Sequence, residues 1–262
     1  MVDRVQFFLL GTSSARPMAN RDNTSLLLRR GGDLLLVDCS ASPVQKILRL
    51  GLNPLNLKRV LVTHGHVDHV YGFPSLLHSL WTYRPRRREP LLVLAPPETC
   101  ILLEELARLF DFRREGKLPF ELRIEALSLR EKHLAVEEEA YRVIVSPVSH
   151  AGAEVVALRF EDSFGRSLAY SSDTEPCESL VRLALGVDTL VMEATRAPGE
   201  DLRGHSTGEE AGELAARARV GRLILVHLLA QTPQEEESLL QMAQKAFGPR
   251  VEIGKEMVPY DL

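Results

Sequence analysis

The chain has 262 residues, 45% of them apolar and 26% charged, which is typical of a globular protein and excludes a disordered one. The net charge of −4 argues against a protein that coats nucleic acid non-specifically, although a local basic patch is compatible with it. No apolar run approaches the ~20 residues of a membrane span, and the N-terminal residues are typical of a strand rather than a signal peptide. We therefore expect a cytoplasmic protein without a membrane partner, with its scattered cysteines as small core residues: Cys39, Cys100 and Cys177.

The N-terminal third of the chain predicts β-strands joined by short turns. Apolar runs bounded by turn residues favour four strands, at residues 5–10, 25–28, 34–37 and 59–62. Before the fourth strand, Ser42 can cap a short helix, because the proline that follows fits the first turn of a helix. Gly51 predicts the end of that helix, and the fourth strand leads directly to His64.

The middle of the chain is less regular. Residues 82–90 predict a loop that holds the only dense basic cluster: Arg84, Arg86, Arg87 and Arg88. A solvated loop is the simpler interpretation of this cluster, and steering of a polyanionic substrate is the alternative. We expect a strand at residues 91–95, a helix at 96–110 and a solvated acidic connection between strands at 131–139.

The C-terminal half alternates strands and helices. The predicted strands are residues 141–148, 155–160, 167–171, 188–192 and 222–226. The predicted helices are residues 178–185, a helix opened by the capping box Thr207-Gly-Glu-Glu210, and a helix from Thr232 to Gly248. Each half can supply a mixed sheet flanked by helices, so we predict an α/β fold, a four-layer αββα sandwich, as a single domain over residues 1–262.

Four predicted strands end in a side chain that can bind a metal ion. These side chains are His64, His150, Asp173 and His227. Ligands gather beyond the carboxyl ends of strands in open α/β sheets, so the four ends can converge on one place. Any one of them alone is explained by a turn, but four of them beside a histidine cluster favour a functional site.

The cluster is His64-Gly-His66-Val-Asp68-His69. His64 and His66 lie two residues apart and can hold one ion from an extended loop, while Asp68 and His69 follow a bend and face a second position. Imidazole and carboxylate ligands without a thiolate suit Zn²⁺ and tolerate Mn²⁺ or Fe²⁺. Two ions held ~3.5–4 Å apart need a bridging carboxylate, and Asp173 is the natural candidate.

Five segments carry a resemblance to a known family. They are the loop at residues 11–23, the metal motif at 63–74, the aspartate motif at 172–178, Glu193-Ala-Thr195 and His205-Ser-Thr207. Together they resemble the metallo-β-lactamase superfamily and, within it, ribonuclease Z, the tRNA 3′-processing endonuclease. The resemblance implies two zinc ions, one held by His64, His66 and His150, the other by Asp68, His69 and His227, with Asp173 bridging them.

The resemblance also implies a mechanism for cleaving a phosphodiester. A hydroxide between the two ions would be the nucleophile. His205 would donate a proton to the leaving O3′, and Glu193 would orient His205 and keep it cationic. Asp68 can accept a proton as well as bind metal. The simpler alternatives are that His205 helps to cap a helix and that Glu193 forms a salt bridge at a strand end.

Three departures from ribonuclease Z affect substrate binding more than the metal ligands. Ribonuclease Z usually carries a basic arm that grips tRNA, commonly inserted between the third histidine motif and the bridging aspartate. Here His150 and Asp173 are only 23 residues apart, with room for a hairpin and no arm. The first loop lacks its usual lysine, and Met192 replaces the first histidine of the His-Glu-Ala-Thr motif.

Three hypotheses about function therefore stand. The first is a ribonuclease Z-type phosphodiesterase acting on tRNA precursors, and the second is an armless phosphodiesterase for small or cyclic phosphodiesters. The third is an ester or lactone hydrolase, or a cofactor-biosynthesis protein, of the same fold. The pair His205 and Glu193 favours phosphodiesters. A homodimer is compatible with the resemblance, but the missing arm removes its main support.

Overall fold

The computed structural model describes residues 5–197, 199 and 202–262, so the whole predicted first strand lies in the described part. By their internal contacts the residues divide into two compact units. Unit 1 comprises Met1–Gly11, Arg21–Leu127 and Glu256–Asp261, and unit 2 comprises Thr12–Asn20, Ser128–Lys255 and Leu262. Each unit is assembled from separate stretches of chain, and the single domain remains a prediction.

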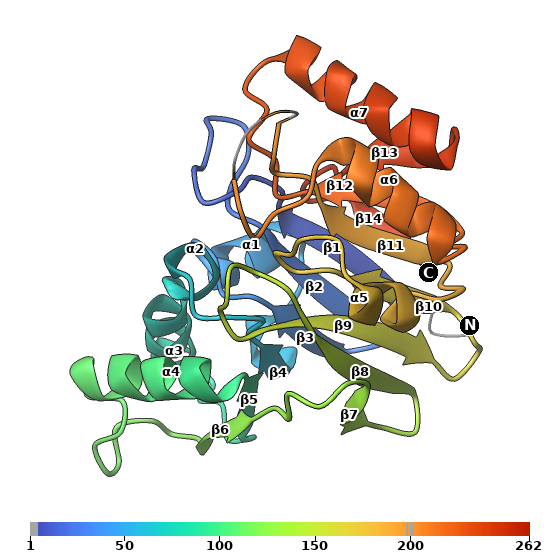
Figure 1. The fold of residues 1–262 in the computed structure, drawn as a ribbon. Helices are drawn as coiled ribbons and strands as arrows, with labels where there is room; N and C mark the ends of the chain where they lie inside the picture. Colours follow the sequence, from blue (N-terminus) through green and yellow to red (C-terminus); the bar gives the residue numbers. More distant parts are fainter. Residues whose placement is uncertain (1–4, 198, 200–201) are drawn as a thin grey trace. The chain divides into compact units, whose positions relative to one another are not determined.

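The sheet of unit 1 has, among the described residues, seven strands in the order β14-β1-β2-β3-β4-β5-β6 (Figure 1). Their bounds are β1 Val5–Gly11, β2 Ser25–Arg30, β3 Asp33–Val37, β4 Leu57–Leu61, β5 Leu91–Ala95, β6 Leu122–Ala126 and β14 Pro259–Asp261. The pairs from β14 to β3 are antiparallel, and those from β3 to β6 are parallel. The predicted hairpin is confirmed: Arg30 pairs with Asp33 across Gly31 and Gly32.

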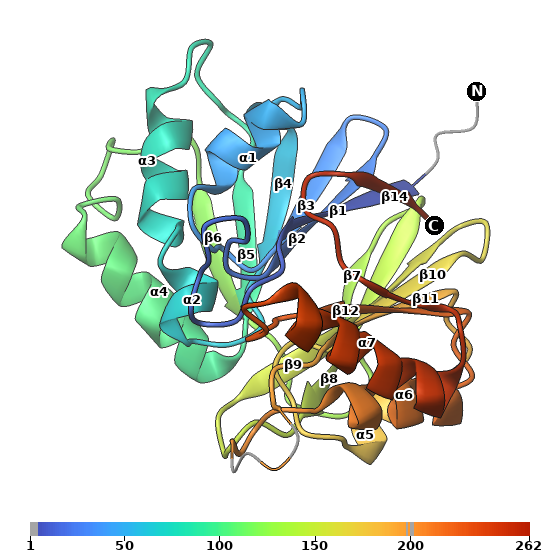
Figure 2. The same cartoon turned by 90° about the horizontal axis from the view of Figure 1, so that it is seen from above.

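The helices of unit 1 pack on this sheet. They are α1 (Pro43–Arg49), the 3-10 turn η1 (Pro54–Asn56), α2 (Val67–Val70), α3 (Phe73–Thr82) and α4 (Pro97–Leu109). Figure 2 shows α1, α3 and α4 on one face of the strands β3 to β6. Helix α3 has a helical apolar spacing that buries one stripe of side chains, at Phe73, Leu76, Leu77 and Leu80.

The sheet of unit 2 also has seven strands among the described residues, in the order β13-β12-β11-β10-β9-β8-β7. Their bounds are β7 His133–Glu137, β8 Tyr141–Val148, β9 Val155–Asp162, β10 Ser167–Tyr170, β11 Thr189–Glu193, β12 Arg222–Val226 and β13 Val251–Ile253. The pairs from β7 to β10 are antiparallel and those from β10 to β13 are parallel. Each unit is thus a mixed sheet with helices, as the sequence predicts.

The helices of unit 2 are α5 (Glu178–Leu183), α6 (Gly208–Arg217) and α7 (Pro233–Phe247). Helices α6 and α7 lie side by side (Figures 1 and 2), and Gly212 allows the approach, since a Cβ there would lie 2.6 Å from the carbonyl oxygen of Ala243. The capping box predicted at Thr207 is present, and Thr232, predicted to open the last helix, forms a second one; each threonine accepts a hydrogen bond from a backbone amide of the first turn.

Several predictions of local structure fail. Residues 131–139 were expected to be a solvated connection, but β7 lies within them and pairs with β8. Its acidic and polar side chains face solvent, and only Val136 is buried, so β7 lacks the clear alternation that reveals a strand. Helix α1 begins at Pro43 as predicted, but the Ser42 side chain makes no capping hydrogen bond. The sequence analysis did not identify α3 or β6. None of the described helices combines the length and apolar character needed to cross a membrane.

Candidate metal and active site

Unit 1 carries the histidine cluster on the segment that follows β4. His64 and His69 are fully buried, with ring centroids 4.1 Å apart, and the ring of His66 lies 4.6 Å from that of His64. His66 is the exposed N-cap residue of α2, and this one-turn helix places Asp68 and His69 on adjacent positions, with 3.5 Å between Asp68 Oδ2 and His69 Nε2. The bend predicted between the two halves of the cluster is this helix.

Asp38 orients the cluster. It follows β3 in the left-handed backbone region, with φ 61°, and is completely buried. Its carboxylate accepts hydrogen bonds from the amide of Thr63 at 2.8 Å and from Nδ1 of His69 at 2.8 Å. A strained backbone at a buried carboxylate is common at functional sites. Asp38 therefore orients His69 and the backbone before His64.

Unit 2 presents its predicted ligands at the ends of separate strands. His150 follows β8, Asp173 follows β10, and His227 follows β12 directly in a left-handed conformation with φ 57°. Asp173 Oδ2 lies 3.3 Å from His227 Nε2. The donor atoms of Asp173, His205 and His227 all lie within 4.8 Å of one another. Two residues of the strand-end pattern, Asp173 and His227, thus lie together with His205.

His150 is fixed by a glycine. Its Nδ1 donates to the carbonyl oxygen of Gly204 at 2.6 Å. Gly204 has φ +88°, and a Cβ at this position would lie 2.7 Å from Nδ1 of His150. Only glycine therefore allows this approach without displacing the histidine or straining the backbone.

Glu193 connects the predicted catalytic pair to a metal ligand. It is the last residue of β11 and is 1% exposed. Its Oε1 accepts from Nδ1 of His205 at 2.9 Å, and its Oε2 accepts from the Thr195 hydroxyl at 2.6 Å. The amides of Thr174 and Thr195 donate to the same carboxylate. These four hydrogen bonds fix the orientation of the carboxylate.

Thr195 is the functional residue that the sequence analysis quoted in a motif without giving it a role. Its hydroxyl lies 2.7 Å from Nδ1 of His227 and donates to Glu193. A hydroxyl can donate only one proton, and Thr195 donates it to Glu193. In the hydrogen bond between Thr195 and His227, the proton must therefore be on Nδ1 of His227. The sequence did indicate that Thr195 lies beside Glu193, because the two residues are two positions apart at a strand end and face the same side.

The histidine hydrogen bonds test whether these side chains suit a metal ion. Five histidines direct Nδ1 to an oxygen of the same unit: His64 to Thr63, His69 to Asp38, His150 to Gly204, His205 to Glu193 and His227 to Thr195. This pattern fixes the ring orientation and turns Nε2 toward a ligand, as in most protein metal sites. Four of the five predicted histidine ligands follow it, so the residues fit a site for divalent metal ions.

The cysteines do not contribute to these groups. Cys39 is fully buried, and Cys100 and Cys177 pack against the cores of units 1 and 2. Burial first, and the charge of Asp38 second, raise the pKa of the Cys39 thiol far above its usual range. Cys39 is therefore a neutral core residue, as predicted.

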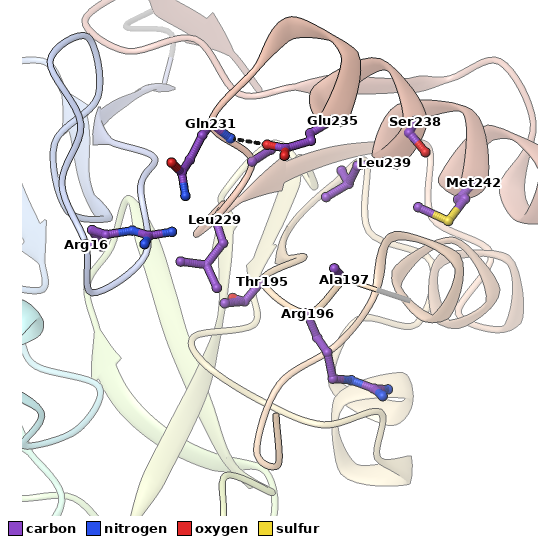
Figure 3. A pocket seen from close by; sticks show the side chains of 11 residues that line it. Arg16, Thr195, Arg196, Ala197, Leu229, Gln231, Glu235, Ser238, Leu239 and Met242 are labelled. Carbon is purple, nitrogen blue, oxygen red and sulfur yellow. Dashed lines mark hydrogen bonds between the residues drawn. The ribbon is translucent and has the colours of Figure 1, made fainter. Parts of the chain in front are cut away.

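Two cavities of unit 2 flank the pair of Glu193 and His205. The first, of about 270 Å³, is lined by Arg16, Thr195, Arg196, Ala197, Leu229, Ala230, Gln231, Glu235, Ser238, Leu239 and Met242 (Figure 3). The second, of about 490 Å³, is lined by Glu175, Pro176, Arg196, Leu202, Arg203, His205 and Glu210. Arg196, which forms a bidentate ion pair with Glu210, lines both of them. Room for a ligand thus exists on the Thr195 side and on the His205 side.

Comparisons with known proteins identify the family of the chain. A profile of the beta-lactamase superfamily domain matches residues 34–228. Ribonuclease Z of Mycobacterium bovis is 30% identical to the chain, over 97% of this chain and 96% of that protein.

Two solved structures have the same fold. The metallo-β-lactamase fold protein YhfI from Bacillus subtilis superimposes with a TM-score of 0.79 at 20% identity, covering 99% of both chains. The short form of human tRNase Z superimposes with a TM-score of 0.77 at 20% identity, covering 97% of this chain and 98% of that one. The predicted fold class is thereby confirmed. The chain belongs to the beta-lactamase superfamily and, within it, to the ribonuclease Z-like metal-dependent hydrolases.

Proposed function

We propose that the chain is a phosphodiesterase that cleaves tRNA precursors at their 3′ side. The observation that carries this proposal is the buried Glu193 carboxylate, which holds His205 within reach of Asp173 and His227. A proton donor at this position serves a reaction whose leaving group is an alkoxide, such as the O3′ of a nucleotide, because an alkoxide leaves slowly unless it is protonated.

We propose that two Zn²⁺ ions bind here, with Mn²⁺ or Fe²⁺ as substitutes. His64, His66 and His150 would hold one ion, Asp68, His69 and His227 the other, and Asp173 would bridge them. The imidazole and carboxylate donors support this choice of metals. When bound, such ions lower the pKa of the attacking water and stabilise negative charge on the phosphate.

The side chains of unit 2 would then manage the proton. Because Nδ1 of His205 is hydrogen-bonded to Glu193, Nε2 is the atom that can donate to the leaving O3′. The Glu193 carboxylate favours the imidazolium form of His205 and keeps its ring oriented. Asp68, besides binding metal, can accept the proton of the attacking water. The cavities lined by Thr195 and by His205 offer room for a nucleic-acid strand that continues beyond the reacting phosphate.

One observation favours a second candidate, an armless phosphodiesterase for small or cyclic phosphodiesters. The chain between His150 and Asp173 forms the hairpin of β9 and β10, in which Leu158 pairs with Tyr170 and Glu161 with Ser167. This hairpin uses the interval where a tRNA-gripping arm is commonly inserted. An ester or lactone hydrolase of the same fold has no need of the His205 proton donor, and therefore receives less support.

Two assays separate these candidates. Metal-loaded protein should hydrolyse bis-p-nitrophenyl phosphate and lose this activity with a chelator. Absence of metal-dependent turnover would contradict both phosphodiesterase proposals. A 3′-extended tRNA should then be cleaved at its 3′ side, whereas turnover of the small ester with an intact tRNA would support the second candidate. We also propose a cytoplasmic location and a homodimer, and light scattering in solution tests the latter.

A further inference from the structure

A basic cavity of unit 1 has no part in the proposed chemistry. It has a volume of about 230 Å³ and is lined by Trp81, Arg86, Arg114, Glu115, Gly116, Lys117 and Pro119. Its walls come from the end of α3, the loop before β5 and the loop after α4. Three of the lining side chains are cationic and one is anionic.

The loop before β5 is anchored so that Arg86 faces this cavity. Arg87, its neighbour, is only 4% exposed and donates to the carbonyl oxygens of Leu55 at 2.9 Å and Pro90 at 2.7 Å. Arg84 donates to backbone carbonyls of the preceding turn. The simpler interpretation of the arginine cluster, a solvated loop, is therefore wrong for Arg87, which is a structural anchor. Arg86 is exposed and available to a ligand.

The opposite wall places a second cation against an aromatic ring. The ammonium of Lys117 lies 4.0 Å from the ring centroid of Trp81, which holds this flexible side chain at the cavity. Arg114 pairs with Asp111 at 3.1 Å, but both side chains are more than half exposed, so a stronger anion can compete for Arg114.

The charge distribution along the chain favours an anionic ligand at this place. Unit 1 has 17 basic and 15 acidic residues, whereas unit 2 has 15 basic and 21 acidic residues. The chain as a whole has a net charge of −4, but unit 1, which contains the basic cavity, has a net positive charge. By formal charge, unit 1 therefore favours a polyanion more than unit 2 does.

We propose that this cavity binds the phosphate backbone of an RNA substrate at a distance from the reacting bond. Arg86, Arg114 and Lys117 would contact the phosphates, with Lys117 held at the cavity by the Trp81 ring. The inference rests on the proposed function, since the RNA bound here is the one to be cleaved. It supplies the grip that the chain would otherwise lack without an arm.

The only tryptophan of the chain makes this site observable, because all intrinsic tryptophan fluorescence comes from Trp81. The metal-loaded His205→Ala variant, which should cleave at least about 10²-fold more slowly than the wild type, is titrated with 3′-extended tRNA at several salt concentrations, within a time too short for cleavage. Tryptophan fluorescence reports the site, and anisotropy of a labelled tRNA reports total binding. The same titrations are made with Arg86→Ala, Arg114→Ala and Lys117→Ala combined, and with a control triple of exposed cations elsewhere: Arg49→Ala, Lys58→Ala and Lys245→Ala.

The cavity triple should weaken tRNA binding by about tenfold or more at moderate salt and reduce the slope of log affinity against log salt by roughly 2, as expected for the loss of two to three phosphate contacts. The control triple should change the slope by less than about 1. With His205 restored, the cavity triple should hydrolyse bis-p-nitrophenyl phosphate at the wild-type rate, which also confirms that it folds.

The outcomes separate this inference from the proposed function. Equal tRNA affinity and salt slope in the cavity triple and the control triple would overturn the inference and leave tRNA cleavage intact. Binding through the cavity without cleavage of the tRNA by the wild-type protein would overturn the tRNA reaction and leave the site intact. A wild-type protein that binds no tRNA at all overturns the inference.

Discussion

The two units have the same pattern of strands, three antiparallel pairs followed by three parallel pairs, but supply their candidate ligands in different ways. Unit 1 places four of them in six consecutive residues after one strand, from His64 to His69. Unit 2 places one residue after each of three strands, at His150, Asp173 and His227. A motif that is continuous in sequence is recognised directly, whereas dispersed residues are recognised only after the strands are predicted.

The supporting hydrogen bonds differ in the same way. In unit 1, the single carboxylate of Asp38 contacts both His69 and the backbone before His64. In unit 2, a backbone carbonyl orients His150, and a relay from Glu193 through Thr195 orients His227. We infer that unit 1 is mainly a metal-binding element, while unit 2 also positions the proton donor.

The largest expected effect comes from removing one ligand of each unit. His64→Ala and His227→Ala should each lower the bound metal below two ions and the turnover of bis-p-nitrophenyl phosphate by about a thousandfold or more. The turnover of the double variant should be no more than about tenfold below that of either single variant, because the effects of residues that act together are not additive. Metal content by mass spectrometry and kcat/KM measure this.

Exposed histidines provide the matched controls. His78 in unit 1 and His133 in unit 2 are both exposed, and their substitution by alanine should change neither metal content nor turnover. Losses of activity that simply multiply in the double variant would mean that the two units contribute to separate sites.

The next effect concerns unit 2 alone. His205→Ala should keep both metal ions but lower kcat on a 3′-extended tRNA by about 10²- to 10⁴-fold, the usual range for a lost general acid. On bis-p-nitrophenyl phosphate the loss should be within about tenfold, because nitrophenolate leaves without a proton. Glu193→Gln should act in the same direction, since it weakens the hydrogen bond that orients His205. An equal loss on both substrates would contradict the proton-donor role.

The sequence predicted the parts of this site that depend on short-range patterns. Strands β8, β5 and β12 were predicted with the observed bounds, because their apolar runs end sharply at polar residues. Strand β7 was missed because it is an edge strand with one buried residue. The roles of Gly204 and Thr195 were missed for a different reason. Each acts on a histidine 32 or more residues away, and only the folded chain shows that contact.

A smaller effect should distinguish how the units orient their ligands. Asp38→Asn in unit 1 and Thr195→Val in unit 2 should each weaken metal affinity by about 10- to 100-fold, while excess metal restores most of the turnover. Thr195→Val should lower kcat further, because Thr195 also contacts Glu193. Titration with a competing chelator gives the affinities, and Thr195→Ser, which keeps the hydroxyl, is the conservative control. A Thr195→Val variant with unchanged affinity would exclude its orienting role.

The smallest expected effect concerns the stability of the fold at acid pH. We expect this effect mainly in unit 2, because most of the described carboxylates with a lowered pKa lie there. Burial alone would raise the pKa of Glu210, but hydrogen bonds from Thr207 and the ion pair with Arg196 outweigh it and hold this pKa below the usual value of about 4.5. A lowered folded-state pKa contributes stability above pH 4.5, and this contribution is lost as the pH falls through the folded-state value. Glu161, paired with Arg142 and Arg159, behaves in the same way despite its burial.

Glu210→Gln should therefore lower the free energy of unfolding by less than about 1 kcal/mol at pH 7, because glutamine can keep the capping contact and only the partly exposed ion pair with Arg196 is lost. The difference from the wild type should shrink as the pH falls below 4.5. In the wild-type protein, hydrogen exchange near pH 4 should increase in α6 and the β8–β9 pair before it increases in β3, β4 and β5, because the described buried or paired carboxylates with lowered pKa values lie mainly in unit 2. Simultaneous loss of protection in both units would instead show that they unfold as one cooperative structure, and would support the single domain that the sequence predicts.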